Sequence, residues 1–447
     1  MDRKISVSYL DVKENVEAFF KSFVDLNVWI HVDVMDNKFV NNFGVDMKYI
    51  KVAKELGFFV DTHLMVEKPL EDKYVENAIL YGTDSITIHQ EIENFDIVLD
   101  KLNSLKKKNN FKIGISLKPG TDIDVLKKYE NKFDLILLMS VEPGKGGQKY
   151  IEATNDKIKK ARKLFKNKVI QVDGGINFET FSYPYLAGAD SLVMGSYFAK
   201  SGDVLSSFRA LEILIEFEKH EKKRNIDFEK RTLQIVPGGY GEFDKLIGIT
   251  SPDLRKLASK WYKLVSLDTL QYFITSNAHE HRKFALFCLS KMANRKGTNL
   301  EALVNFVDNN LEYINNWDLT DEVSPNVIGK YLLTLSDKEK ITKINSYLSS
   351  KNYWIRRIGI VSCLTLARRG DYTICEKVAK GNMYDDNYLI QKAVGWLLRE
   401  VYKKHPNEVV KFLSENNKKN KKIGKFVISY ACEKMTQEEK IKVRGEK

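Results

Sequence analysis

The chain has 447 residues, more than one hydrophobic core usually serves, so we expect two domains of roughly 220 residues each. Residues 1–220 carry 31 Lys and Arg against 33 Asp and Glu, whereas residues 221–447 carry 41 against 27. The net charge of +12 therefore belongs entirely to the second half. A broad basic face binds polyanions through counterion release, which favours nucleic acid as its partner, with a solvated Lys-rich surface as the alternative.

Cysteine usage and hydropathy argue against a cysteine metal site and against a secreted or membrane protein. The four cysteines, Cys288, Cys363, Cys375 and Cys432, all lie in the second half without metal-like spacing, so we expect reduced core thiols. The start, MDRKISVSYLDVKE, lacks the apolar stretch of a signal peptide, and no apolar run approaches the roughly 18 residues of a membrane span. We therefore expect a soluble, cytoplasmic protein with no membrane partner.

Eight short apolar, β-branched runs recur through the first half with helical stretches between them. They are residues 4–8, 28–33, 58–63, 85–89, 112–117, 134–139, 169–173 and 191–195. Buried parallel strands have this composition, and the spacing of roughly 22 to 30 residues leaves room for one crossover helix each, as in a (β/α)8 barrel. An open doubly wound sheet is the alternative. A barrel requires the active site to lie at the C-terminal ends of its strands.

Polar side chains end three of these runs. His31 and Asp33 are two residues apart at the end of the second strand, so both point to one face of it. His63 ends the third strand and Asp173 the seventh. Two imidazoles and two carboxylates at one end of a barrel predict a divalent-metal site, and mixed nitrogen and oxygen ligation suits Zn²⁺, Fe²⁺, Mn²⁺ or Co²⁺ better than Mg²⁺ or Ca²⁺.

Glycine-rich turns follow the last three strands, at PGKGGQ (143–148), DGGIN (173–177) and MGSYF (194–198). Glycine allows backbone N–H groups to approach an anion closely, and the usual phosphate cradle of a barrel follows strands seven and eight. Each turn alone is a weak signal. Three in consecutive loops beside a metal set predict a phosphorylated sugar as the substrate.

The motifs HVDVMD, HLM, LMSVEPGKGGQKYI and QVDGGIN resemble the ribulose-phosphate 3-epimerase family, in its order, over about residues 3–200. The resemblance implies that His31, Asp33, His63 and Asp173 bind the metal, and that Asp33 and Asp173 also transfer protons on opposite faces of the substrate. The implied substrate and phosphate contacts are His63, Ser8, Gly144, Lys145, Gly146, Gly147, Gly174, Gly175, Gly195 and Ser196. Met35, Met65 and Met139 match the apolar cushion around the intermediate.

Four positions depart from the family pattern. Asn37 and Lys38 stand where Gly and His are usual, Lys145 stands within the usual PGFGG, and Val7 replaces a usual Pro. Lys38 and Lys145 add cations near the expected mouth, so another ketose phosphate, such as allulose 6-phosphate, stays open as the substrate. An inactive barrel is a further alternative. The resemblance also implies a tendency to form homo-oligomers through the barrel.

The segment EFEKHEKKRN (216–225) is charged and lacks apolar periodicity, so we expect the linker there, between domains 1–217 and 222–447. Beyond it strand signals vanish and amphipathic helical runs follow one another. Helix starts are expected with Ser251 as N-cap before Pro252, and at Ser266 and Ser336. Helix pairs recurring at roughly 35 to 45 residues predict a HEAT-type solenoid, with a compact helical bundle as the alternative.

Trp317 lies in a polar context, NNWDLTD, and Asp321 follows one helical turn later on the same face. A carboxylate beside an aromatic ring on a basic surface can stabilise a cationic, oxocarbenium-like sugar. The alternative is a helix cap with a buried aromatic anchor.

The second half resembles the AlkD-like HEAT-repeat family of alkylpurine DNA glycosylases over about residues 228–445, through FDKLIGITSPDLRKLA, YINNWDLTDEVSP, YWIRRIGIVSCL and LIQKAVGWLLREVYKK. The resemblance implies that Asp321 is the catalytic carboxylate, that Trp317 and Trp396 hold the deoxyribose, and that Arg357 contacts the DNA backbone, with no cofactor. A non-catalytic nucleic-acid-binding scaffold is the alternative.

Overall fold

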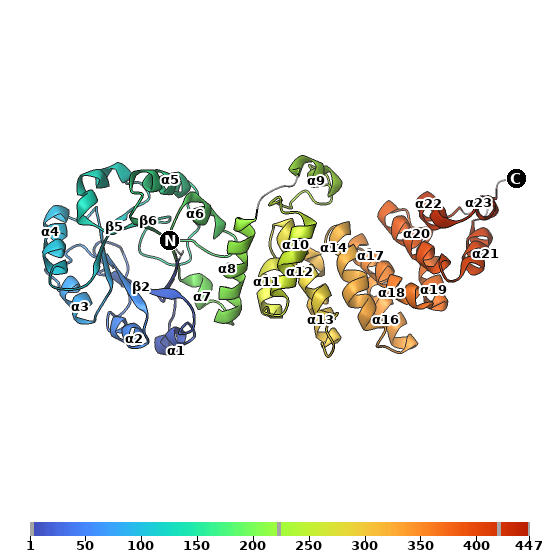
Figure 1. The fold of residues 1–447 in the computed structure, drawn as a ribbon, viewed down its shortest axis with the longest axis horizontal. Helices are drawn as coiled ribbons and strands as arrows, with labels where there is room; N and C mark the ends of the chain where they lie inside the picture. The colour runs from blue at the N-terminus through green and yellow to red at the C-terminus, as the bar shows by residue number, and fades with distance from the viewer. Residues whose placement is uncertain (1–3, 221–224, 418–421, 446–447) are drawn as a thin grey trace. The chain divides into compact units, whose positions relative to one another are not determined.

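The computed structural model describes residues 4–220, 225–417 and 422–445, and the chain divides into two compact units, Met1–Lys219 and His220–Lys447 (Figure 1). The linker expected at 216–225 includes residues 221–224, which lie outside the described residues, as do the expected domain limits at 1, 222 and 447. Within the described ranges, no helix is both long enough and apolar enough to cross a membrane.

The first unit is a closed barrel of parallel strands in chain order, so the open-sheet alternative is excluded. Each predicted run forms a strand, with ends that differ by two residues at most. The strands are β1 (Lys4–Ser8), β2 (Val28–Met35), β3 (Phe59–Met65), β4 (Ser85–His89), β5 (Lys112–Leu117), β6 (Leu135–Met139), β7 (Val169–Asp173) and β8 (Ser191–Met194).

Helices surround the barrel and cover its outer face (Figure 1). They are α1 (Val16–Lys21), α2 (Tyr49–Glu55), α3 (Tyr74–Leu80), α4 (Phe95–Lys106), the 3₁₀ helix η1 (Ile123–Lys132), α5 (Thr154–Leu164), α6 (Ser182–Ala187), α7 (Ser196–Ala199) and α8 (Val204–Lys219). Because aliphatic side chains fill both faces of most strands, the strands are nearly fully buried, and the inward polar groups stand out against them.

The described residues of the second unit form helices and no strand. Its helices are α9 (Ile226–Thr232), α10 (Ser251–Trp261), α11 (Leu267–Ile274), α12 (His279–Met292), α13 (Leu300–Asp308), η2 (Leu311–Tyr313), α14 (Trp317–Val323), η3 (Ser324–Ile328), α15 (Gly329–Leu332), α16 (Asp337–Leu348), α17 (Tyr353–Ser362), α18 (Leu364–Arg369), α19 (Tyr372–Asn382), α20 (Tyr388–Tyr402), α21 (Pro406–Asn416), α22 (Lys425–Ala431), η4 (Cys432–Lys434) and α23 (Gln437–Arg444). The four cysteines are buried and free, as expected.

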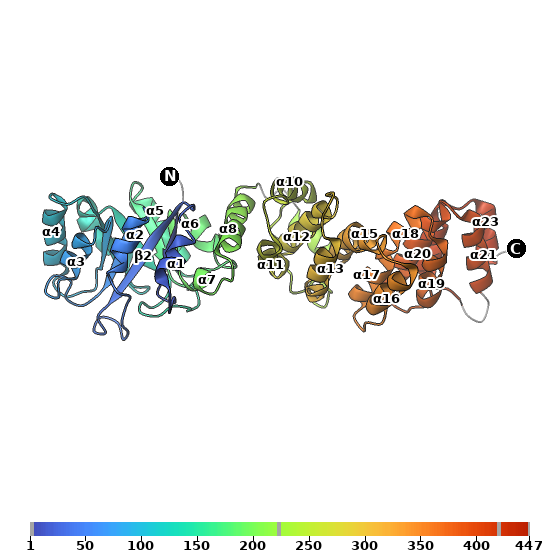
Figure 2. The same ribbon diagram turned by 90° about the horizontal axis from the view of Figure 1, so that it is seen from below.

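The helices of this unit stack in two layers, the arrangement expected of a helical solenoid (Figures 1 and 2). One layer is continuous, because α10, α12, α14, α17, α20 and α22 each pack against the next. The other layer includes α11, α16 and α19, which pack against α12, α17 and α20 respectively. The continuous layer carries the residues of the second candidate site.

Side-chain caps begin most of these helices. Ser266 and Ser336 cap α11 and α16 as predicted, and Ser336 forms a capping box with Glu339. The predicted cap at Ser251 is wrong by one residue, because the Thr250 side chain accepts the hydrogen bond from the Asp253 N–H. Ser251 is the first helical residue, and Pro252 lies in the first turn, where a missing N–H costs nothing.

Candidate functional site

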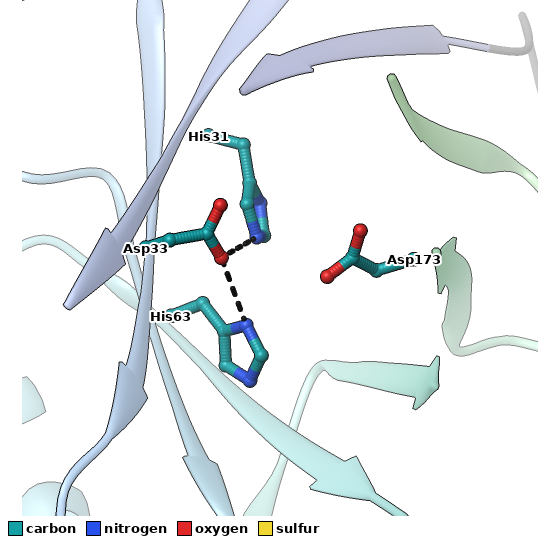
Figure 3. Close-up of side chains that lie close together, drawn as sticks. All are labelled: His31, Asp33, His63 and Asp173. Carbon is teal, nitrogen blue, oxygen red and sulfur yellow. Dashed lines mark ion pairs between the residues drawn. The ribbon is translucent and has the colours of Figure 1, made fainter. Parts of the chain in front are cut away.

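Four polar side chains meet at the C-terminal end of the barrel. His31 and Asp33 come from β2, His63 from β3 and Asp173 from β7, and their ligand atoms lie within 4.8 Å of one another (Figure 3). Three of the four lie on the directly paired strands β2 and β3, where Asp33 is the register partner of His63. Barrel closure brings Asp173 to the opposite side of the same point.

Three of these ligand atoms face one another without a hydrogen-bond partner among the described residues. Oδ1 of Asp33 lies 3.3 Å from His31 Nε2 and 3.4 Å from His63 Nδ1, and none of the three atoms has a hydrogen bond within the described residues. The other oxygen of Asp33 accepts a 2.7 Å hydrogen bond from the Ser8 hydroxyl. Each unsatisfied buried polar atom costs about 1–3 kcal/mol, so three that converge on one point fit a bound cation.

His31 is oriented by a carboxylate that the sequence reasoning missed. Its Nδ1 lies 2.7 Å from Oδ2 of Asp61, which also accepts a 2.6 Å hydrogen bond from the Gln171 side chain. Because a carboxylate accepts hydrogen bonds, Nδ1 of His31 carries a proton, and Nε2 is the ring nitrogen that faces the site. Asp61 precedes His63 by two residues on β3, and this period-two position was the signal available to find it.

The charges of the site favour a cation. Burial lowers the pKa of His31, but Asp61 and Asp33 outweigh burial and hold it well above the usual value. Burial raises the pKa of Asp33, but His31 and His63 outweigh it and hold that pKa far below the usual value. Burial and the charge of Asp33 raise the pKa of Asp173. A positive charge is thus stabilised beside Asp33, and Asp173 is the carboxyl group that holds a proton more readily.

A cavity opens directly above this point. It is lined by these sequence-predicted residues: Ser8, Asp33, Met35, Met65, Met139, Gly144, Lys145, Gly146, Gly147, Asp173, Gly174, Gly175, Gly195 and Ser196. His31 and His63 are fully buried beneath it. Asp11 also lines the cavity and was missed, although its carboxylate packs against the backbone of Gly146.

The glycine turns have backbone conformations that other residues rarely adopt. Gly174 and Gly175 have φ of 118° and 67°, and a Cβ at Gly175 would lie 2.4 Å from the Tyr150 N atom. Asn37, where the family usually has Gly, keeps a positive φ of 56°, which asparagine tolerates best after glycine. Lys145 lines the cavity, whereas Lys38 is exposed, with its ammonium 3.8 Å from Asp72. Of the two added cations, only Lys145 faces the cavity.

A second cavity, of about 520 Å³, lies on the continuous layer of the helical unit, within the range of about 300–1,000 Å³ typical of ligand pockets. It brings together Trp317 and Asp321 of α14, Arg357 of α17 and Trp396 of α20. Tyr240, Tyr388, Lys392, Arg399 and Tyr430 also line it and were missed by sequence reasoning. Tyr388, Lys392 and Arg399 are eight residues before, four before and three after Trp396, the helical spacing that was the signal available.

Asp321 is held by a guanidinium. Nε and Nη2 of Arg357 donate to its two oxygens at 2.9 and 2.8 Å, and Nη1 of Arg357 donates to the Leu389 carbonyl at 2.6 Å. The Arg357 side chain is only 7% exposed, whereas that of Asp321 is 19% exposed and borders the cavity. Burial raises the pKa of Asp321 despite the opposing effect of Arg357. The guanidinium expected to contact DNA is therefore engaged with the carboxylate.

Trp317 is half-buried. It is neither a helix cap nor a fully buried side chain of the core. Asn316 caps α14, with its side chain accepting from the Trp317 N–H at 2.8 Å. The indole N–H donates to the Thr232 carbonyl at 3.4 Å while the ring borders the cavity. Aromatic faces and one carboxylate thus share an open, basic surface.

Comparisons with known proteins divide the chain at the same region. The family model described as "Ribulose-phosphate 3 epimerase family" matches residues 4–199, and the one described as "DNA alkylation repair enzyme" matches residues 213–435. Over 188 residues, 40% of this chain, it is 36% identical to 81% of the ribulose-phosphate 3-epimerase, cytoplasmic isoform, of Oryza sativa subsp. japonica. Over 173 residues, 37% of this chain, it is 36% identical to 77% of the ribulose-phosphate 3-epimerase of Bacillus subtilis.

Further similar proteins are found among solved structures. A predicted DNA alkylation repair enzyme from Enterococcus faecalis is 16% identical, with 48% of this chain and 98% of that chain covered and a TM-score of 0.37. A 3-hexulose-6-phosphate synthase is 16% identical, with 46% of this chain and 96% of that chain covered and a TM-score of 0.36.

Proposed function

Because the chain belongs to the ribulose-phosphate 3-epimerase family over residues 4–199, we propose that its barrel inverts carbon 3 of a ketose phosphate, interconverting D-ribulose 5-phosphate and D-xylulose 5-phosphate. The observation that carries this proposal is the pair of carboxylates, Asp33 and Asp173, that face each other across the point where His31 and His63 meet (Figure 3). Inversion requires proton removal on one face of carbon 3 and proton return on the other.

The two carboxyl groups suit these two steps. Asp33, which faces the two histidine nitrogens, begins as the carboxylate that removes the proton from carbon 3. Asp173, on the other side of the site, begins protonated and returns a proton to the opposite face of the ene-diolate. The reverse reaction uses the same groups with their roles exchanged. Because the two groups interact, their titrations belong to the pair rather than to either residue.

His31, Asp33, His63 and Asp173 would hold one divalent cation, Zn²⁺, Fe²⁺, Mn²⁺ or Co²⁺, which would stabilise the negative charge developing on the substrate oxygens. Met35, Met65 and Met139 line the cavity and would exclude water from the reacting carbon. Gly174 and Gly195 line the cavity, where the backbone N–H groups of such turns would bind the phosphate, and Lys145 adds a positive charge.

Metal removal and isotope exchange test this proposal. Chelation should abolish interconversion of D-ribulose 5-phosphate and D-xylulose 5-phosphate, and Fe²⁺ or Zn²⁺ should restore it. In deuterium oxide, the product should carry solvent deuterium at carbon 3. Turnover that survives chelation, or a product without deuterium, contradicts the proposal. The same assay with allulose 6-phosphate measures substrate preference, and inversion of that sugar alone would reassign the substrate.

We also propose that the helical unit hydrolyses the bond between deoxyribose and an alkylated purine in DNA. The supporting observation is Asp321, whose carboxylate is held by Arg357 at the edge of a cavity lined by Trp317 and Trp396. As the bond to a cationic N3- or N7-alkylpurine breaks, positive charge develops on the sugar, and a positioned carboxylate stabilises that charge. The aromatic faces pack against the deoxyribose.

Methylated duplex DNA distinguishes catalysis from binding alone. The intact protein should release methylated bases, and Asp321→Asn should abolish release while leaving DNA binding in place. Glu322→Gln is the matched control, because Glu322 lies on the same helix, pairs with Arg255 and does not line the cavity. Retention of DNA without base release by the wild-type protein supports the alternative of a non-catalytic scaffold.

A further inference from the structure

One histidine of the barrel lies directly behind a proposed metal ligand. His89, the last residue of β4, is fully buried, and its Nε2 lies 2.9 Å from Nε2 of His63. The two rings stack, with centroids 5.0 Å apart. A hydrogen bond between two ring nitrogens holds a single proton, so one ring must donate and the other accept.

Glu91 determines which ring donates. Its Oε1 accepts hydrogen bonds from the Lys118 backbone N–H at 2.8 Å and from the Thr121 hydroxyl at 2.5 Å, and its Oε2 lies 3.1 Å from Nδ1 of His89. Burial alone would raise the pKa of Glu91, but the hydrogen bonds with His89, the Thr121 hydroxyl and the Lys118 N–H outweigh it and lower that pKa to about 2. An ionised carboxylate only accepts, so Nδ1 of His89 carries a proton.

The remaining steps follow from the geometry of His63. Its Nδ1 is the atom that faces Asp33 Oδ1 without a hydrogen bond within the described residues, so this nitrogen needs its lone pair to bind a cation and the ring proton belongs on Nε2. His63 must therefore donate through Nε2–H, and Nε2 of His89 accepts. The proton of the His89 ring then lies on Nδ1, toward Glu91.

We propose that Glu91 and His89 form a positioning relay that fixes the tautomer of His63, so that its Nδ1 lone pair is directed at the cation. The proposal rests on the proposed metal role of His63. The relay is also held sterically, since the Phe39 ring lies 4.7 Å from the ring of His89, and the Lys118 ammonium lies 4.3 Å from the Phe39 centroid. His31 contacts its carboxylate partner, Asp61, directly, whereas His63 is linked to Glu91 through an intermediate ring.

Glu91→Gln should reverse the relay rather than simply weaken it. The amide oxygen of Gln would stay with its two donors, Lys118 N–H and the Thr121 hydroxyl, which places the NH₂ group against Nδ1 of His89. His89 would then accept at Nδ1 and donate through Nε2, so the proton of His63 would move to Nδ1. This tautomer cannot bind a metal through Nδ1, and affinity should fall about 10–100-fold.

The test is ¹⁵N nuclear magnetic resonance of the full-length, metal-free chain labelled at histidine, which has seven such residues. Long-range couplings identify the protonated nitrogen of each ring, and the signals lost in His63→Gln assign His63. We expect protonation at Nε2 of His63 in the wild type and at Nδ1 in Glu91→Gln. Competition with a chelator measures the Zn²⁺ affinity of each variant. Thr121→Val is the matched control, since it removes one donor to Glu91 but leaves a carboxylate facing His89.

A wild-type His63 protonated at Nδ1 overturns the relay, and this result needs no variant to fold. A folded Glu91→Gln protein with unchanged tautomer and unchanged Zn²⁺ affinity overturns it as well. The expected tautomers in a chain that binds no Zn²⁺ support the relay and reject the metal role of His63 instead, so the two failures are distinguishable.

Discussion

The central carboxylates of the two candidate sites differ in their hydrogen bonding. In the barrel, Oδ1 of Asp33 faces two histidine nitrogens without a hydrogen bond in the described part of the chain, so these atoms are free to bind a cation. In the helical unit, both oxygens of Asp321 already accept from one guanidinium, and its open side borders a cavity. Buried polar atoms that converge without hydrogen bonds are typical of a metal site. A carboxylate that a guanidinium holds at the edge of a cavity is typical of a site that stabilises positive charge on a substrate.

The largest expected effect is on proton transfer in the barrel. Asp173→Asn should lower epimerase turnover by about 10²–10⁴-fold, because the group that returns the proton is lost. Steady-state kinetics in both directions measure this. Asp84→Asn is the control, since Asp84 pairs with Lys54 before β4, at the opposite end of the barrel, and should leave turnover unchanged. Unchanged turnover in Asp173→Asn would end the two-carboxylate scheme.

A buried charge network in the helical unit should make that unit sensitive to acid. Burial raises the pKa of Asp318, but His279 and Lys283 outweigh it and hold the pKa well below its usual value. A lowered folded-state pKa contributes stability that is present above the unfolded value of about 4 and is lost as pH falls. Asp318→Asn should therefore cost about 3 kcal/mol at neutral pH and progressively less in acid. Tryptophan fluorescence during urea unfolding, at several pH values, measures this difference.

A smaller effect is expected at Asp61, whose carboxylate contacts the proposed metal ligand His31. Asp61→Asn replaces an obligate acceptor by an amide that can also donate to His31, so divalent-metal affinity should fall about 10–100-fold. Metal content after dialysis against a chelator measures the change. The same dialysis should leave base release by the helical unit intact, because Asp321 needs no metal. Unaltered metal affinity would show that Asp61 does not orient His31.

The smallest expected effect separates two roles for Arg357. Arg357→Lys removes the two-point contact with Asp321, so base release should slow by about tenfold, while affinity for undamaged DNA and its salt dependence stay constant. A residue that contacts a DNA phosphate would instead weaken binding to all sequences and reduce the salt slope by about one. Binding isotherms at several salt concentrations, beside base-release rates, decide between the two roles.

The strands of the barrel were predictable because their signal is local. Apolar, β-branched runs at regular spacing placed all eight strands within two residues, and the rule that barrel sites lie at C-terminal strand ends grouped His31, Asp33, His63 and Asp173. Asp61 and Glu91 were missed, although both lie two residues from a histidine. Their roles depend on which nitrogen of a neighbouring histidine ring is protonated. Contacts between strands decide the position of that proton.

The sequence by itself therefore determined the two-part architecture, the order of the strands and the polar residues that face the barrel mouth, because propensity and periodicity act over a few residues. Only the tertiary structure decided the pairings: His89 behind His63, Asp61 behind His31, Asp11 against Gly146 and Arg357 on Asp321. These contacts join residues 26 to 135 positions apart, brought together by barrel closure and helix stacking, and such distances leave no local pattern in the chain.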